Sequence, residues 1–372
     1  MMRILLLGEY SGFHKNLQSG LRKLGCEVVV ASYSDGWKGI NGDISLGSPG
    51  IRKTDVLINQ FCVKAFNALP KLKNFDIVQI INPVVFPCHI AGMFGTTFLN
   101  EILINRIIEH SKKSYLVAAG NDSYYRVACE NRLFRYSPLE DEQIYDYNGT
   151  LRKIFGYDWS KNHLKKWNAS LARSVNGVIP IAYEYSVPYR NDNKVNLCET
   201  VAMPLDVDNI PFMGISNNDR LTFVHGLNRY GFKGTKYIEK AFDLFKNEQS
   251  KHNCFIRAPM PLKQYLKDLE QVSVVVDQTN SYSYAMNALY SMALGKVVLS
   301  GCEKECVDEY KIKPGVFLQN ILPDEYDILY KMKTLCENIN ISYESESARQ
   351  FIIDNHHDKK IAQKYLEIWS GR

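Results

Sequence analysis

The sequence lacks any apolar run long enough to cross a membrane, and its first residues lead us to expect no secretory leader. No window approaches the roughly 18 apolar residues of a membrane-spanning helix. The first residues, MMRILLLGEYSG, contain one basic residue and only a short apolar run, whereas a signal peptide needs an apolar stretch of roughly 7 to 15 residues. We therefore expect a cytoplasmic protein.

Cysteine pairs with the spacing of a zinc site or a redox motif are missing as well. The nine cysteines are irregularly spaced, their number is odd, and none forms a Cys-x-x-Cys pair. This pattern is typical of reduced thiols and not of a disulfide framework. Cys302 and Cys306 have no matching His or Cys pair nearby, so we expect no metal site there.

Clustered basic residues, which a dedicated nucleic-acid binder carries on one face, are also absent. The formal net charge is only +5, and the Lys and Arg residues are dispersed along the chain. We expect no nucleic-acid partner, and the charge fits an anionic small ligand or an anionic membrane surface. The segment HIAGMFGTTFLNEILINRII (residues 89–108) is apolar enough to touch a membrane, but a helix buried against a sheet has the same pattern, and we favour the buried helix.

At 372 residues, with an apolar share of 45%, the chain is long enough for two globular domains of roughly 150 to 200 residues each. Strands and helices alternate in both halves, which predicts parallel sheets with helices on both faces. We expect an α/β protein with two Rossmann-like doubly wound domains facing across a cleft, over residues 1–200 and 201–355. The proline-punctuated segment VAMPLDVDNIPF (residues 201–212) reads as the linker, and a helix over residues 356–372 can pack back on the first domain.

The expected strands are short apolar runs bounded by polar or glycine-containing turns. In the first half they cover residues 3–8, 26–32, 75–83, 114–120 and 176–182. In the second half they cover residues 220–226, 253–259, 272–278 and 295–300. Ligands of such sheets bind outside the carboxyl ends of the strands, so the loops that follow the strands are the places to search for a site.

The loop after the first strand, GEYSG (residues 8–12), offers flexible backbone before a helix. It lacks both the Gly-x-Gly-x-x-Gly spacing of a dinucleotide fingerprint and the Gly-Lys-Ser/Thr ending of a P-loop. A ligand contact and a tight strand-to-helix turn are therefore both open readings of this loop.

A second loop, HGLNRYGFKGT (residues 225–235), carries Arg229 and Lys233 between Gly226 and the start of a helix. Two cations beside a helix N-terminus are unfavourable unless an anion joins them, because the helix dipole already presents positive charge there. The loop thus predicts a phosphate ligand, and two solvated cations are the alternative. Because Lys233 is expected to be exposed, its replacement by Ala is expected to weaken ligand binding and to leave folding intact.

A third loop, in the stretch VVVDQTNSYSYAMNALYSMALGKVV, precedes a helix and consists of Asn280, Ser281, Tyr282 and Ser283. Successive loops at one sheet edge can lie side by side. In that case their backbone N–H groups, together with Arg229 and Lys233, would form a cradle for a diphosphate. A nucleotide diphosphate fits such a cradle.

These features in this order resemble the donor-binding domain of nucleotide-sugar glycosyltransferases of the GT-B fold, specifically the retaining family 4 (group 1). The resemblance covers residues 221–300 and rests on the Lys-Gly pair after the glycine loop and on SMALGKVV, which is similar to the family's Glu-Ala-Met-Ala-x-Gly-Lys-Pro-Val. It implies that Arg229 and Lys233 bind the donor diphosphate. In the first half, AGNDSYYR (residues 119–126) is similar to the family's acceptor-side loop.

Both glutamates of the family motif are replaced in this sequence, by Tyr282 and Tyr290. In the family one glutamate lies near the donor sugar and the other holds the ribose hydroxyls. A tyrosine can hydrogen-bond a ribose hydroxyl or stack on a sugar, but as a neutral group it cannot copy a bidentate carboxylate. Tyr290 also shares a helix face with Met286, so packing is an equal alternative. Donor choice and the retaining or inverting outcome stay open.

Candidates for acid or base chemistry are few. Asp122 lies just past LVAAG at the carboxyl end of a strand, and a helix or turn cap is the alternative for it. His14, at the start of the first helix, can face the cleft and contact a sugar or phosphate, or it can lie at the surface. His225 ends a strand in the phosphate region and can equally pack in the core.

We expect a metal-independent glycosyltransferase of the hexosyltransferase type, with no cofactor other than its nucleotide diphosphate sugar donor. The acceptor is expected to be a glycan or a lipid-linked molecule, in surface polysaccharide or glycoconjugate synthesis. A peripheral contact with the inner face of a membrane stays open. One alternative is a nucleotide-sugar epimerase of the same architecture. The other is a non-catalytic module that binds the nucleotide sugar, which the two missing glutamates favour.

Overall fold

The structure is a computed structural model that describes residues 1–33, 38–47, 54, 62–86, 96–142, 161–215, 220–227, 230–337 and 341–371. The chain divides into two compact units. Unit 1 contains Met1–Asn131, Tyr147–Pro204 and Asp358–Arg372, and unit 2 contains Arg132–Asp146 and Leu205–His357. The segment Arg132–Asp146 thus belongs to unit 2, although the chain on either side of it belongs to unit 1.

Unit 1 is built on a six-stranded parallel sheet with the order β3-β2-β1-β4-β5-β6. The strands are β1 (Arg3–Leu7), β2 (Glu27–Ser32), β3 (Ile44–Ser45), β4 (Phe75–Ile80), β5 (Ser111–Ala118) and β6 (Gly177–Pro180). In the register of the sheet, Leu5 pairs with Val29 on one side and with Val78 on the other. This is the strand order of a Rossmann-type sheet, and it reverses between β1 and β4. The apolar runs of the sequence form strands here because helices bury both sheet faces.

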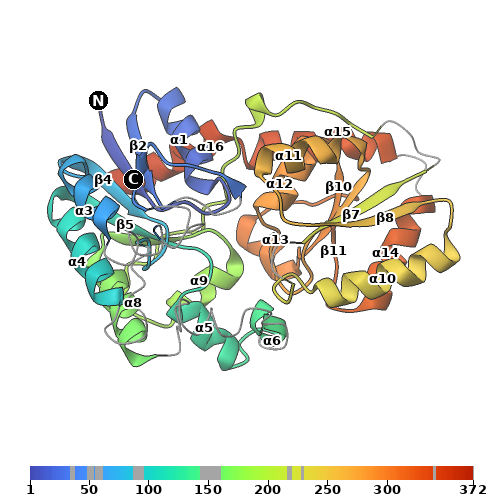
Figure 1. Cartoon of the computed structure of the whole chain (residues 1–372), viewed down its shortest axis with the longest axis horizontal. Helices are drawn as coiled ribbons and strands as arrows, with labels where there is room; N and C mark the ends of the chain where they lie inside the picture. Colours follow the sequence, from blue (N-terminus) through green and yellow to red (C-terminus); the bar gives the residue numbers. More distant parts are fainter. Residues whose placement is uncertain are drawn as a thin grey trace. The chain divides into compact units, whose positions relative to one another are not determined.

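The helices of unit 1 include the last helix of the chain. They are α1 (Phe13–Lys23), α3 (Val63–Ala68), α4 (Thr96–Glu109), α5 (Ser123–Glu130), α8 (Asn162–Ser174), α9 (Tyr183–Arg190) and α16 (Asp358–Ser370). Helix α16, red in Figure 1, packs against the blue α1. A Cβ at Gly20 would lie 2.2 Å from the carbonyl oxygen of Asp358, so this glycine permits the close approach. Lys23 also forms an ion pair of 2.9 Å with Asp358.

Unit 2 contains a five-stranded parallel sheet with the order β11-β10-β9-β7-β8. The strands are β7 (Thr222–Gly226), β8 (Asn253–Arg257), β9 (Val274–Val276), β10 (Val297–Ser300) and β11 (Leu318–Asn320). Val275 of β9 pairs with Val224 of β7 and with Val298 of β10. The strand order reverses between β7 and β9, which is the position where doubly wound sheets bind their ligands.

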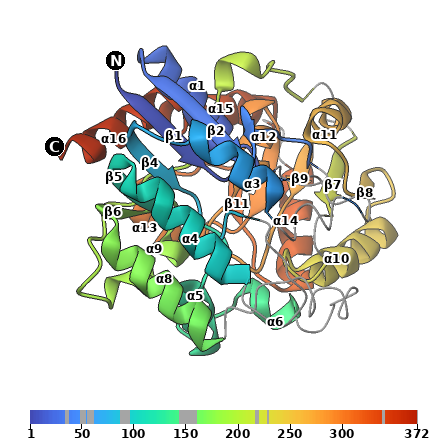
Figure 2. The ribbon, with the colours of Figure 1, turned by 60° about the vertical axis from the view of Figure 1, so that its left-hand side comes forward.

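Helices cover both faces of this second sheet, as Figures 1 and 2 show. Those of unit 2 are α6 (Pro138–Glu142), α10 (Thr235–Glu248), α11 (Leu262–Asp268), α12 (Met286–Ala293), α13 (Lys304–Tyr310), α14 (Glu325–Glu337) and α15 (Ile341–Asn355). Helix α10 packs against α14 on one face, and α12 packs against α15 on the other. Phe242 and Phe245 of α10 join Val274 and Met332 in one buried core.

The structure confirms the expected α/β fold with two doubly wound parallel sheets and also contains strands that the pattern did not reveal. The strands β3 and β11 are two and three residues long and lie at sheet edges. An edge strand needs only one neighbour and a short hydrogen-bonded stretch, so it leaves no long apolar run in the sequence.

The apolar segment 89–108 is partly described, since residues 89–95 lie outside the described ranges. Helix α4 buries Leu103, Ile104 and Ile107, which agrees with the favoured reading of a helix packed on a sheet. Phe98 and Ile102 of the same helix are 65% and 43% exposed. Within the parts of the chain that the structure describes, no helix is both long and apolar enough to cross a membrane.

The expectation of reduced cysteines needs one correction. Among the described residues, the free thiols are those of Cys26, Cys129, Cys198, Cys254, Cys302, Cys306 and Cys336. Cys62 is disulfide-bonded. Spacing along the chain could not reveal this, because a disulfide requires two thiols to meet in the fold and not in the sequence.

Candidate functional site

The loops that follow β7 and β9 contact each other at the point where the strand order of unit 2 reverses. The backbone N–H of Thr279 donates to the carbonyl of Lys233 at 3.0 Å, and the side-chain amide of Asn280 donates to the carbonyl of Gly231 at 3.3 Å. Between them Gly234 has a φ of 71°, and a Cβ there would lie 2.1 Å from the Thr279 hydroxyl. The side-by-side arrangement that the diphosphate cradle requires is therefore present within unit 2.

Lys233 lies in this contact as one half of a buried ion pair. Its Nζ lies 2.6 Å from Oδ1 of Asp277, and Asn287 donates to the same oxygen at 2.8 Å. Asp277 is completely buried and Lys233 is 9% exposed. The expectation of an exposed loop lysine, removable without an effect on folding, is therefore wrong. Removal of Lys233 would leave an uncompensated carboxylate in the protein interior, which is strongly unfavourable.

The second oxygen of this pair's carboxylate has hydrogen-bonding capacity that the described residues do not fill. Oδ2 of Asp277 is buried and has no hydrogen-bond partner among those residues, and the buried hydroxyl of Tyr265 lies in the same region. The Tyr265 hydroxyl lies against Gly226, where an added Cβ would come within 3.0 Å of it. An acceptor and a hydroxyl of this kind can bind the hydroxyl groups of a ligand.

A second lysine of the same region, Lys236 in the first turn of α10, pairs with a carboxylate from another part of unit 2. Its Nζ lies 2.5 Å from Oδ1 of Asp141, and Asn280 donates to the other oxygen of Asp141 at 2.9 Å. Asp141 is itself buried, with 4% of its surface exposed. Reasoning from the sequence missed both residues. The Lys-Gly-Thr-Lys spacing places Lys236 one residue inside the helix, but no pattern connects it to Asp141.

His225, at the end of β7, is a packed residue of the core. Its Nδ1 lies 2.8 Å from the carbonyl oxygen of Val276, and its Nε2 lies 3.0 Å from the hydroxyl of Thr235. The carbonyl can only accept, so Nδ1 carries the proton and Nε2 accepts from Thr235. Burial, with the nearby charge of Lys233, lowers the pKa of His225 to about 4. The neutral ring thus connects β7, β9 and α10.

Tyr282 in the third loop holds the segment that carries Asp141. Its hydroxyl accepts from the backbone N–H of Arg135 at 2.8 Å, and the Arg135 guanidinium lies 4.6 Å from the centre of its ring. Arg135 in turn pairs with Glu303 at 3.1 Å and with Glu305. The ring of Tyr282 is therefore committed to contacts within unit 2, and only 3% of the residue is exposed.

The other predicted donor-binding residues are placed as follows. Ser281 and Gln278 both donate side-chain hydrogen bonds to the carbonyl of Ser283, at 3.0 and 2.8 Å, and so shape the third loop. Tyr290 lies on α12 and is buried, as is Met286. Its contact with a ribose stays a prediction. Arg229 lies outside the described residues.

In unit 1, Asp122 caps a helix. Its Oδ1 accepts from the backbone N–H of Tyr125 at 2.8 Å, which is an N-cap of α5, and its Oδ2 accepts from the Tyr189 hydroxyl at 2.6 Å. Burial raises the pKa of Asp122 to about 6, although both hydrogen bonds act in the opposite direction. Asp122 therefore has the geometry of a helix cap, which is the alternative to a catalytic residue. Its role as an acid or base stays a prediction.

His14 is completely buried in unit 1 and does not lie at the surface. Its Nδ1 lies 2.7 Å from the carbonyl oxygen of Gly8, and its Nε2 lies 3.2 Å from the side-chain nitrogen of Gln79. Burial lowers the pKa of His14 to about 4, so the ring is neutral near pH 7. A contact with a sugar or phosphate stays a prediction.

In the loop GEYSG (residues 8–12), the side chain of Glu9 binds the backbone N–H groups that a ligand would otherwise contact. Glu9 accepts from the backbone N–H groups of Gly12 at 2.7 Å and of Lys15 at 2.9 Å, and it is 5% exposed. A buried carboxylate at the start of α1 already satisfies these donors. These contacts are typical of a tight strand-to-helix turn, which is one of the two alternatives for this loop.

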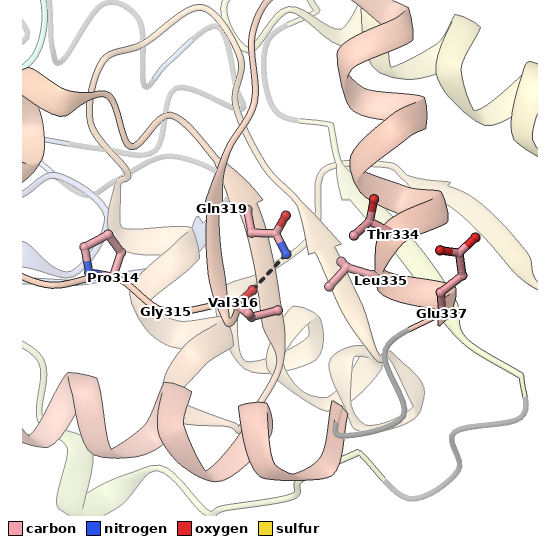
Figure 3. A pocket seen from close by; sticks show the side chains of 7 residues that line it. All are labelled: Pro314, Gly315, Val316, Gln319, Thr334, Leu335 and Glu337. Atoms are coloured by element: carbon pink, nitrogen blue, oxygen red, sulfur yellow. Dashed lines mark hydrogen bonds between the residues drawn. The ribbon is translucent and has the colours of Figure 1, made fainter.

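A surface pocket of about 730 Å³ lies elsewhere in unit 2, beside the edge strand β11 and helix α14 (Figure 3). Its lining consists of Pro314, Gly315, Val316, Gln319, Thr334, Leu335 and Glu337. The side chain of Gln319 donates to the carbonyl of Val316 at 3.1 Å on the β11 side of the pocket. The lining has no cation and shares no residue with the loops after β7 and β9, so it does not suit a phosphate.

No protein-family model and no curated protein matches the sequence. Solved structures are similar in fold. Sucrose-phosphate synthase from Thermosynechococcus elongatus has a TM-score of 0.59 at 10% identity, with 100% of both chains covered. Anabaena Alr3699/HepE in complex with UDP and glucose has a TM-score of 0.55 at 10% identity, again with 100% of both chains covered.

A third similar structure is that of a mutant of S. aureus TarM in complex with Fondaparinux, alpha-GlcNAc-glycerol and UDP. It has a TM-score of 0.53 at 13% identity. The match covers 82% of this chain and 58% of the TarM chain, so the protein spans little more than half the length of that relative. At these identities the similarity shows the fold alone. The protein has the GT-B fold, with two Rossmann-like doubly wound domains.

Proposed function

We propose that the protein is a glycosyltransferase that moves a sugar from a nucleotide diphosphate sugar to a glycan or lipid-linked acceptor. The observation that carries the proposal is the contact between the loops after β7 and β9, which brings Lys233 and Asn280 to the strand-order reversal of unit 2. Two proteins of similar fold, HepE and TarM, have been solved with UDP. Their ligand supports a nucleotide diphosphate as the ligand of this site.

In the proposed reaction the bond between the sugar's anomeric carbon and the diphosphate oxygen breaks, and the diphosphate leaves with the electron pair. The acceptor hydroxyl oxygen forms the new bond to that carbon and loses its proton. Lys233, the predicted Arg229 and the backbone N–H groups of the third loop would stabilise the negative charge that develops on the leaving oxygen. Because these groups neutralise the diphosphate, we propose that the reaction needs no metal ion.

Acid or base chemistry by Asp122 remains part of the proposal. A carboxyl group with a pKa of about 6 can exchange a proton near neutral pH, which supports the role. The two hydrogen bonds that already occupy its oxygens count against it. The substitution Asp122→Asn separates these cases, because an amide can cap the helix but cannot exchange the proton.

We also propose a location and a pathway, from two exposed apolar side chains of unit 1. The side chains of Phe98 and Ile102 are exposed on one helix of unit 1. Exposed apolar side chains of this kind support a peripheral contact of a cytoplasmic enzyme with the inner face of a membrane, where lipid-linked acceptors are found. Surface polysaccharide or glycoconjugate synthesis is the corresponding pathway.

A second candidate function is a non-catalytic module that binds a nucleotide sugar without turnover. The observation in its favour is that Tyr282, at the position of a family glutamate, is buried against Arg135 and contributes no carboxylate. A module of this kind would still bind the donor through its diphosphate.

The two functions can be separated with a panel of nucleotide sugars. A donor that binds only the native state raises the apparent thermal stability, so a thermal-shift screen identifies the nucleotide. Release of free nucleotide diphosphate from that donor is then measured with and without candidate acceptors. Release that depends on the protein supports a transferase, tight binding without product supports the module, and a panel without any stabilising nucleotide refutes both.

A further inference from the structure

Both lysines described beside the contacting loops of unit 2 are neutralised by carboxylates of the protein itself. Lys233 pairs with Asp277 at 2.6 Å, and Lys236 pairs with Asp141 at 2.5 Å. A diphosphate binds best to unpaired positive charge, so a lysine that is released by its carboxylate would add to the binding assigned above to Arg229 and the backbone N–H groups.

The two carboxylates differ in how firmly the fold holds them. Asp277 follows directly after β9, is completely buried, and accepts a second hydrogen bond from Asn287. Asp141 lies in the five-residue helix α6. Among the described residues, the hydrogen bonds to its side chain come from Lys236 and Asn280, and thus from the loop region itself. Asp141 is also buried, with 4% of its surface exposed, but it differs from Asp277 in that a short helix and not a core strand positions it.

The contacts of Asp141 are those that a phosphate would make. Each of its oxygens accepts one hydrogen bond, one from the ammonium of Lys236 and one from the amide of Asn280. A carboxylate and a phosphate both present negatively charged acceptor oxygens to such donors. Asn280 is also one of the residues that the sequence pattern assigns to the donor site.

We propose that Asp141 occupies the position of a donor phosphate, and that Lys236 and Asn280 bind this phosphate once Asp141 has moved away. The inference rests on the proposed function, because it assigns further residues to the same nucleotide diphosphate site. It makes Asp141 an internal competitor of the donor. The observed donor affinity is lowered in proportion to the fraction of molecules in which Asp141 is seated.

Release of Asp141 does not require the whole segment to detach. Arg135 holds the start of the segment independently, through its pairs with Glu303 and Glu305 and its contact with Tyr282. The short helix α6 can therefore move about an anchored point. This anchor keeps the competitor close to the site and makes the exchange reversible.

The test is the binding of inorganic pyrophosphate and of UDP to the full-length variant Asp141→Asn, measured by titration calorimetry. The amide keeps the shape of the side chain but removes the charge that competes with a phosphate. We expect the dissociation constant for pyrophosphate to fall by about tenfold. This change corresponds to an Asp141 side chain that occupies the phosphate position in about nine of ten wild-type molecules. A further substitution, Lys236→Met, should abolish this gain.

The matched control is Asp308→Asn, which removes the same charge from an exposed position of α13, where Asp308 pairs with Lys304. It should leave the dissociation constant within twofold of wild type. Equal affinities of wild type and Asp141→Asn, or equal gains in both Asn variants, would overturn the inference and leave the proposed function standing. Weaker binding by Asp141→Asn would also overturn it, since Asp141 would then help to hold the ligand.

If neither the wild-type protein nor any variant binds pyrophosphate or UDP, the proposed function itself fails and the inference falls with it. A measurement on the wild-type protein covers the case in which Asp141→Asn does not fold. Hydrogen–deuterium exchange of residues 138–142, the helix α6, should increase when pyrophosphate is added at saturation. Unchanged exchange in this segment, with pyrophosphate bound, would contradict the release of Asp141.

Discussion

Nζ of Lys233 lies 2.6 Å from Oδ1 of Asp277, and the two residues form a buried ion pair inside unit 2. Lys233 comes from the loop after β7, and Asp277 comes directly after β9. A residue selected for ligand binding thus also has a structural role. Loss of activity in a Lys233 variant would therefore not identify a donor contact unless the stability of the variant is measured as well.

The first prediction concerns Lys233→Ala. The variant should lose about 3 to 5 kcal/mol of unfolding free energy, because it leaves the charge of Asp277 buried without its partner. The double variant with Asp277→Asn should recover a large part of this loss, since the unpaired charge is then gone. Chemical denaturation measures both. Lys304→Ala, at a lysine whose side chain is 85% exposed, is the control and should change little. A single variant as stable as wild type would contradict the buried pair.

Tyr282→Phe tests the anchor of the segment that carries Asp141. The substitution keeps the ring beneath Arg135 and removes only the hydroxyl that accepts from the Arg135 N–H. We expect a loss of about 1 kcal/mol of unfolding free energy, because one part-buried donor loses its partner. Tyr326→Phe removes a hydroxyl from a residue that is 67% exposed and should have no measurable effect. Equal stability of the two variants would argue against the anchor.

Asp122→Asn separates a helix cap from an acid or base. Asparagine is as good an N-cap as aspartate, whereas Asp122→Ala should cost about 1 to 2 kcal/mol of unfolding free energy. We expect Asp122→Asn to fold with near wild-type stability and to lose sugar transfer, because an amide cannot exchange the proton. Transfer rates and melting temperatures are measured on both variants. Full transfer activity in Asp122→Asn would remove Asp122 from the mechanism.

The pH dependence of stability should carry a contribution from His14. Burial lowers its folded-state pKa to about 4, so between pH 6.5 and 4 the unfolded chain binds the proton and the folded protein does not. Stability is therefore lost as the pH falls through this window, by at most about 1.4 kcal/mol per pH unit for one histidine. Asp122 acts in the opposite direction, because its pKa is raised to about 6 and its protonation favours the folded state as the pH falls.

The two contributions are separated by comparing slopes. Unfolding free energies of wild type and His14→Gln are measured between pH 6.5 and 4. The wild-type value should fall more steeply with decreasing pH than that of the variant, whatever the difference at neutral pH. Parallel profiles would show that His14 is protonated equally in the folded and unfolded states.

Much of the fold was predictable because it depends on local patterns. Apolar runs such as RILLL become buried parallel strands, and the helical spacing of Ile361, Tyr365 and Trp369 becomes the buried face of α16. The alternation of the two patterns determines a doubly wound sheet, and the loops at strand ends mark the edge where a site can form. The short edge strands β3 and β11 escaped this reasoning because they have too few residues to show a period.

The sequence alone determined the two α/β units and the loops that could hold a phosphate. Only the tertiary structure decided which charges meet in those loops. Asp277 lies 44 residues from Lys233, and Asp141 lies 95 residues from Lys236. Both pairs depend on strand order and on the packing of the segment Arg132–Asp146 with unit 2, and neither leaves a periodic signal in the chain. The physical reason is that local propensity fixes backbone elements, whereas the neutralisation of a buried charge depends on whichever distant side chain the assembled fold places next to it.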